Sequence, residues 1–256
     1  MRLLSRTLAL ILVAFTAAAL TTVVTLRGRG QSVGEGAPPD KQRQQREEFE
    51  SQFPVTDFDS QEPADPDKRN SRRKKSSRHD NSHFVNKGDA TGGAVESVFF
   101  DERDFGIPAV PVSQSEVIVV GSVADAQAYL SNDKTGVYSE FNVAVQEVLK
   151  NSSPALLAVK SIVSMEREGG AVRYPSKGKY LYRISGQGMP RVGKRYLFFL
   201  KASEPPQTFE IITAYELRGG KVVPLDSSQQ FDSYKNVGEA VFLDGVRNAV
   251  ERLGGR

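Results

Sequence analysis

Residues 8–26 form a run of nineteen residues without a charged side chain, LALILVAFTAAALTTVVTL. A helix of this length spans about 28 Å, close to the ~30 Å hydrocarbon core of a membrane. The run is apolar on every face, which argues against a helix at the surface of a soluble domain. We therefore expect a single transmembrane segment, preceded by a basic tail at residues 1–7.

Two interpretations of this run remain open. A cleaved signal peptide would have a shorter apolar core, of about 7–15 residues, followed by small residues at the cleavage site. Ala17, Ala18 and Ala19 are small, but seven more apolar or Thr residues follow before Arg27. This length favours an uncleaved signal anchor.

The run predicts a single-pass protein of the inner (plasma) membrane, with two conflicting indications of orientation. Lys and Arg are slightly more numerous on the C-terminal side, which favours a cytoplasmic C-terminal domain. A basic start followed by an apolar run is instead the general form of a secretory signal. We favour an exported C-terminal domain.

Residues 27–93 are poor in apolar side chains. Ten of these 67 residues are Ala, Val or Phe, and none is Leu, Ile, Met, Trp or Tyr. This content cannot bury enough surface to offset the entropy of ordering, so it predicts a disordered, charged tether. A domain at residues 94–256 follows it.

One stretch of the tether, residues 68–78, holds seven bases and no acid. The simpler interpretation is a solvated linker. The alternative is an electrostatic contact with anionic lipid, nucleic acid or a cell-wall polymer. The bases that would make this contact are Lys68, Arg69, Arg72, Arg73, Lys74, Lys75 and Arg78.

A β-rich pattern begins near residue 94. Residues 115–126 are a continuous β-branched run, typical of a buried strand, and NDKTG at 132–136 predicts a turn. Residues 137–145 alternate, with Phe141 and Val143 on one face and Tyr138 and Glu140 on the other, as in a half-buried strand. Further strands are expected at 156–165, 179–184, 195–200, 209–217 and 221–225.

Residues 195–200 (RYLFFL) carry apolar side chains on both faces, which predicts a strand covered on both sides. Residues 237–253 repeat apolar side chains at helical spacing, which predicts a terminal helix able to cover one of them. Six or seven short strands without βαβ alternation predict a mainly β fold: a small OB-like Greek-key barrel or sandwich with one C-terminal α-helix.

The order of the segments SEVIVVGSV, YSEFNVAVQEVLK, SIVSMEREGGAVRYPS, GQGMPRVGKRYLFFL and TAYELRGGKVVPLD resembles a group of uncharacterised bacterial exported domains. These are similar to the OB-like barrel of netrin and metalloproteinase-inhibitor modules. The resemblance covers about residues 114–256, and its most specific part is MPxVGxxYLxFL, from Met189 to Leu200. It implies an OB-like fold and no activity. The chain lacks the N-terminal Cys of the inhibitor modules, so inhibition by zinc chelation is not implied.

Several classes of site are excluded or disfavoured. A chain without Cys has no disulfide, no Cys-ligated metal and no Cys nucleophile. The two His, His79 and His83, lie in the tether, which excludes a Ser-His-Asp triad in the domain. Residues 188–195 (GMPRVGKR) nearly match a phosphate-binding loop, but Arg195 stands where Ser or Thr would ligate magnesium. We expect no metal, no cofactor and no enzymatic activity.

Carboxylates offer one route to catalysis, because a pair about 5–9 Å apart across a cleft can act as a hydrolase. Glu166 and Glu168 flank Arg167, and a second cluster precedes the first strand of the domain. That cluster is Asp101, Glu102 and Asp104. We interpret both groups as adjacent surface charges.

Aromatic and basic residues mix between residues 173 and 196, a composition that can stack bases and hold phosphates on an OB barrel. The simpler interpretation is that the aromatics fill the core and the bases face solvent. The zero net charge of residues 94–256, with 19 Lys or Arg and 19 Asp or Glu, supports it. The residues that would face a ligand are Tyr180, Tyr182, Arg183, Arg191 and Lys194.

Together these patterns predict a single-pass membrane protein that displays a non-enzymatic β-barrel interaction module, with a role in envelope assembly. Its expected partners are the membrane and a protein or envelope polymer, and nucleic acid is not favoured. Two alternatives stay open: a membrane-tethered OB-type nucleic-acid-binding module and a carboxylate-dependent hydrolase.

Overall fold

The computed structural model describes residues 53–82, 98–101, 106–154, 157–175, 178–203 and 208–254. The predicted transmembrane run lies outside these residues. Within them, no helix has the length and apolar character needed to span a membrane.

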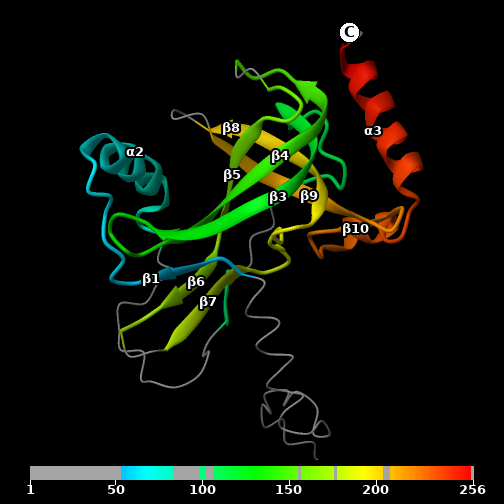
Figure 1. Cartoon of the computed structure of the whole chain (residues 1–256). Helices are drawn as coiled ribbons and strands as arrows, with labels where there is room; N and C mark the ends of the chain where they lie inside the picture. The colour runs from blue at the N-terminus through cyan, green and yellow to red at the C-terminus, as the bar shows by residue number, and fades with distance from the viewer. Residues whose placement is uncertain are drawn as a thin grey trace, which may run out of the picture. The chain divides into compact units, whose positions relative to one another are not determined.

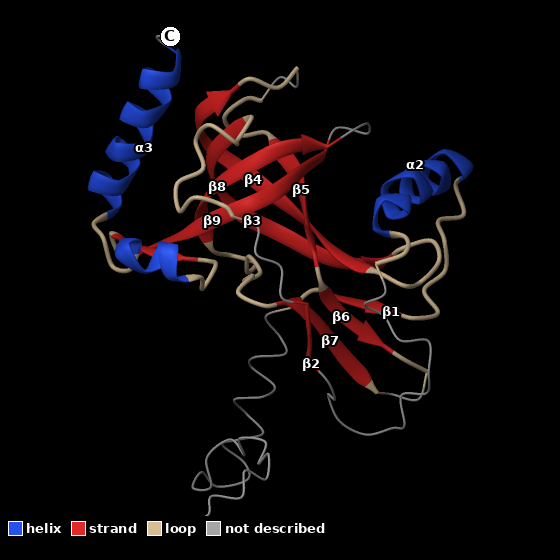
Figure 2. Cartoon of the chain, turned by 180° about the vertical axis from the view of Figure 1, so that it is seen from behind, coloured by secondary structure: helices blue, strands red, loops and turns tan. Residues whose placement is uncertain are grey.

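The described residues form a mainly β structure with a C-terminal helix, as expected (Figures 1 and 2). The strands are β1 (Val55–Asp57), β2 (Val98–Asp101), β3 (Val117–Leu130), β4 (Val137–Asn151), β5 (Ile162–Glu168), β6 (Gly170–Arg173), β7 (Lys179–Ile184), β8 (Arg195–Ser203), β9 (Thr208–Arg218) and β10 (Lys221–Pro224). The helices are α2 (Pro66–Ser76), α3 (Glu239–Gly254) and the 3₁₀ helices η1 (Ser77–His79) and η2 (Gln229–Tyr234).

Five strands pair in a closed ring, which makes a barrel. β3 pairs with β4 and β4 with β5, both antiparallel. β5 pairs with β9 in parallel, and β9 returns through β8 to β3 by antiparallel pairing. β10 extends the edge of β9. A second, smaller sheet has the order β1-β6-β7-β2.

β8 is apolar on both faces, as its sequence predicts. Tyr196, Phe198 and Leu200 belong to the core inside the barrel, whereas Leu197 and Phe199 belong to a second core under α3. α3 supplies three buried side chains to this second core: Phe242, Leu243 and Val246. The terminal helix therefore contributes, together with η2, to the core on the outer face of β8.

Two strand predictions need correction. β5 begins at Ile162 and not at residue 156, and Val159 is 54 % exposed. The chain turns there, and the N–H of Lys160 donates to the carbonyl of Val145. The sequence does not predict β6, because its four residues are too few to show an alternation of apolar side chains.

The predicted disorder of residues 27–93 does not hold for residues 53–82, which contribute β1, α2 and η1. β1 pairs in parallel with β6. Both β1 and α2 are stabilised by partners that lie far away along the chain, which the composition of the segment itself cannot reveal.

Candidate interaction site

α2 begins with strong local signals, although Pro66 is its only apolar residue. The carboxylate of Asp65 accepts hydrogen bonds from the backbone N–H groups of Asp67 and Lys68, so Asp65 is the N-cap. Pro66 occupies the first turn, where no intrahelical partner for its N–H is needed. Bases fill the last turn, at the negative end of the helix dipole. α2 continues into η1, and we call residues 66–79 the basic segment.

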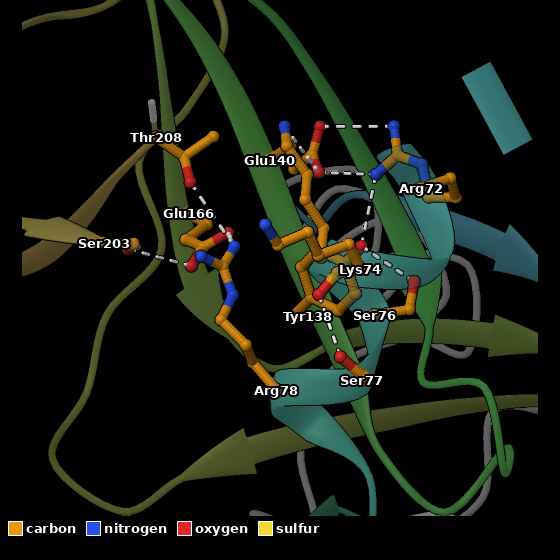
Figure 3. Close-up of polar contacts among 11 residues, drawn as sticks. Arg72, Lys74, Ser76, Ser77, Arg78, Tyr138, Glu140, Glu166, Ser203 and Thr208 are labelled. Atoms are coloured by element: carbon orange, nitrogen blue, oxygen red, sulfur yellow. Dashed lines mark hydrogen bonds and ion pairs between the residues drawn. The ribbon is translucent and has the colours of Figure 1, made fainter. Parts of the chain in front are cut away.

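The basic segment lies against the outer surface of β4 and β5 (Figure 3). Two carboxylates that face it, Glu140 of β4 and Glu166 of β5, are direct cross-strand neighbours. Arg72 pairs with both oxygens of Glu140, and Lys75 Nζ lies 3.4 Å from the same carboxylate. These contacts leave 12 % of the Glu140 side chain exposed.

Arg78 forms the second ion pair of the site. Its Nη2 lies 2.6 Å from Oε2 of Glu166 and 3.3 Å from Oγ1 of Thr208. Ser203 donates to the other oxygen of Glu166 at 3.3 Å. Burial raises the pKa of Glu166, although Arg78 acts in the opposite direction. A carboxylate as buried as this one, 5 % exposed, depends on its positive partner.

Tyr138 of β4 lies at the centre of the contact and is fully buried. Its hydroxyl accepts a hydrogen bond from Arg72 Nη1 at 3.1 Å and lies 3.1 Å from Ser76 Oγ. The ring of His79 stacks on the ring of Tyr138 with centroids 4.1 Å apart. Burial lowers the pKa of His79 to about 4, and Arg78 acts in the same direction. His79 is therefore neutral at pH 7, and its Nε2 is buried without a hydrogen-bond partner among the described residues.

The turn after η1 is fixed to the loop between β3 and β4. The N–H of Asn81 donates to Asp133 Oδ2 at 2.8 Å, and the N–H of Asp133 donates to Asp80 at 3.2 Å. Gly136 is so close to η1 that a Cβ there would lie 2.3 Å from the carbonyl oxygen of His79. The predicted NDKTG turn is thus also a contact surface.

The seven bases predicted to make an electrostatic contact divide into three groups. Those that pair with barrel carboxylates are Arg72, Lys75 and Arg78. Those whose side chains bind the loop before α2 are Arg69 and Arg73. Those that are exposed are Lys68 and Lys74. For the first group the partner is the chain itself. A contact of the others with lipid or polymer stays a prediction.

The alternation along β4 predicts Tyr138 and Glu140 on one face of the strand, but it does not reveal the segment that covers them. Two signals point to it. An Asp-Pro pair at residues 65–66 suits a helix start, and the bases at residues 72, 75 and 78 recur every three residues.

The five residues predicted to face a ligand fall on two separate elements. Those on β7 of the smaller sheet are Tyr180, Tyr182 and Arg183. Those in the loop before β8 are Arg191 and Lys194. Tyr182 is buried, and Arg191 Nη2 lies 2.6 Å from Glu216 Oε2. With Tyr182 buried, the five side chains do not all face solvent.

The interpretation of Glu166 and Arg167 as surface charges is wrong, because both are buried. Arg167 Nη2 donates to both oxygens of Asp226, at 2.9 and 2.8 Å, and Thr213 donates to the same carboxylate at 2.7 Å. This buried pair borders a cavity of about 700 Å³ that Glu168 also lines. The charges are buried because each has a partner of opposite sign.

The near-match to a phosphate-binding loop leads into strand β8, as predicted, and the N–H of Arg191 donates to the hydroxyl of Tyr196. No group of three His, Asp or Glu in the described ranges is arranged to hold a metal ion. His83, Glu102 and Asp104 lie outside those ranges. No known family model matches the chain, and no curated protein matches it in sequence.

Proposed function

We propose that the closed ring is an OB-type barrel. Counted from β3, the strands pair in the order first, second, third, fifth, fourth and back to first, with the fifth parallel to the third. This Greek-key order is that of OB folds. It supports the fold that the resemblance implies for residues 114–256.

OB barrels bind ligands on the face of their second and third strands and on the loops that follow the first and fourth. In this chain those parts are β4, β5, the loop at residues 131–136 and the adjoining ends of β8 and β9. The basic segment and the turn after it contact β4 and β5, the end of β9 and the 131–136 loop. The ligand face is therefore occupied by the chain itself.

The protein is a non-enzymatic module for binding other proteins. The observation that carries this function is the pair of carboxylates, Glu140 and Glu166, at the centre of the ligand face. Carboxylates repel phosphates, so this face disfavours nucleic acid. Both are engaged with bases of a polypeptide, which also disfavours the hydrolase alternative.

The nucleic-acid alternative is tested on the whole chain in detergent, with a labelled single-stranded oligonucleotide at low and high salt. We expect that any binding comes from exposed bases such as Lys68 and is unchanged by Tyr180→Ala with Arg183→Ala. Tight binding that this double substitution removes would contradict the proposal and favour a nucleic-acid module.

The module is displayed from the inner (plasma) membrane by residues 8–26, with its C-terminal domain exported toward a protein or polymer of the envelope.

Leu12→Arg places a charge near the centre of the run and should cost about 2.5–3.5 kcal/mol of insertion free energy. The protein should then shift to the soluble fraction, as measured by membrane fractionation. A C-terminal reporter fusion tests the orientation. Trimming of the unmutated chain near Ala19 would favour a signal peptide instead.

A further inference from the structure

The two carboxylates under the basic segment, Glu140 and Glu166, do not stabilise the sheet in which they lie. Glu140 and Glu166 are register partners on adjacent antiparallel strands. Like charges directly opposite each other destabilise a sheet unless a third group neutralises them. The two strands therefore form a fixed binding site for a positively charged group. The site needs a basic ligand, which can come from the same chain or from another protein.

The basic segment that covers these carboxylates does not insert an aliphatic side chain into a pocket of the barrel. α2 contains no aliphatic or aromatic side chain apart from Pro66. Its side chains meet the barrel through ion pairs, hydrogen bonds and the guanidinium of Arg72, which lies 3.5 Å from the centroid of the Tyr129 ring, and η1 adds the ring of His79. Charge complementarity of this kind sets specificity and orientation, so another segment with the same charge pattern can compete for the two carboxylates.

We propose that the acidic face, formed by Tyr138, Glu140 and Glu166, is a receptor for a basic helical segment of a partner protein, and that the basic segment is its tethered, displaceable occupant. This inference rests on the proposed function and adds the chemistry of the partner.

The occupant shows what a partner must present. Arg72, Lys75 and Arg78 follow each other at intervals of three residues and so share one side of the segment. His79 follows the last base and covers Tyr138. A partner segment carries Lys or Arg at the same three positions and a flat ring directly after the third.

Tethering explains why the face is covered when no partner is present. A segment joined to its own receptor acts at an effective concentration that reaches the millimolar range for short connections. A partner therefore binds only when its concentration or its affinity is high enough to displace the tethered segment. Removing the three contacting bases should therefore open the face to a free peptide.

The experiment uses the whole chain in detergent and a fluorescein-labelled peptide of residues 64–82. The open variant carries Arg72→Gln, Lys75→Gln and Arg78→Gln. The matched control carries Lys68→Gln, Arg73→Gln and Lys74→Gln, which removes as many charges from the basic segment but none that pairs with the barrel carboxylates. Circular dichroism and hydrogen exchange of β3 and β8 verify folding, and Arg78→Gln alone replaces the open variant if the triple substitution unfolds it.

By fluorescence anisotropy, the open variant should bind the peptide about tenfold or more tightly than the wild type and the matched control. The affinity should fall with salt, and Glu140→Gln with Glu166→Gln in the open variant should abolish binding. A folded open variant that binds no better than the wild type overturns the inference, as does binding that survives loss of both carboxylates. If the open variant instead binds an oligonucleotide through its acidic face, the proposed function fails as well.

Discussion

Gly136 shows at the scale of one residue what the docking of the basic segment requires. A Cβ at this position would lie 2.3 Å from the carbonyl oxygen of His79 and 2.7 Å from Ser82 Oγ. We expect Gly136→Ala to push η1 away from the barrel and to speed hydrogen exchange in residues 66–79 by about tenfold. Gly245→Ala on α3, where a Cβ meets nothing within 4 Å, is the control. Unchanged exchange in the Gly136 variant would show that η1 does not need this close approach.

His79 makes the same contact depend on pH. Its pKa is lowered from 6.5 to about 4 in the docked state, mainly by burial, so docking favours the neutral ring. The neutral His79 ring therefore contributes fully to the stability of the docked state above pH 6.5. This contribution is lost as the pH falls toward 4. Glu166, whose pKa burial raises, opposes the trend by binding protons more tightly when docked.

We expect the His79 effect to dominate between pH 7 and pH 5, because the ordinary pKa of a His ring, 6.5, falls within this interval. Between pH 7 and pH 5 the protection of residues 66–79 against hydrogen exchange should fall about tenfold, after correction for the intrinsic rate. His79→Phe keeps a ring on Tyr138 but cannot titrate, so its protection should stay nearly constant. An equal pH response in both proteins would assign the effect to the carboxylates.

Among the elements, β8 has the clearest energetic role, because its two faces belong to two cores. Phe198→Ala leaves a cavity inside the barrel, and Phe199→Ala leaves one under α3. Each should lower the free energy of unfolding by about 3–5 kcal/mol in urea titrations. Val192→Ala, at a side chain that is 54 % exposed, should change it little. A near-neutral Phe199→Ala would mean that α3 does not seal the outer face.

The elements that the sequence could predict are those whose signal is local. The alternation along β4, the two apolar faces of β8 and the helical period of α3 are all visible within about ten residues. The docking of α2 could not be predicted in this way, because its partners Glu140 and Glu166 lie 68 and 88 residues from Arg72 and Arg78. Charged residues are also rarely buried, so the sequence alone predicts Glu166 to be a surface charge.

For the whole molecule, docking sets the order of proteolytic cleavage. Trypsin needs a locally unfolded stretch, so the bases of α2 should be cut slowly while the segment is docked. The composition of residues 27–52 predicts earlier cleavage there, after Arg46 and the bases before it. Mass spectrometry should find a first stable fragment that begins at Glu47, because no Lys or Arg occurs from residue 47 to residue 67. In the variant with Arg72→Gln, Lys75→Gln and Arg78→Gln, cleavage after Lys74 should become about as fast as cleavage after Arg46. Rapid cleavage at Lys74 in the unmodified chain would contradict docking in solution.

The polar character of the contact between the basic segment and the barrel also has a thermodynamic consequence. When the basic segment is released from the barrel, the change in heat capacity and the dependence on urea both scale with the surface that becomes exposed. The change in heat capacity comes mainly from apolar surface. Release of the segment exposes the rings of Tyr138 and His79 but no aliphatic side chain of α2 apart from Pro66, which is a small apolar area beside the two cores of the barrel. Calorimetry and urea titration should therefore report the melting of the barrel alone, and a chain with its segment released should give nearly the same transition as a closed one.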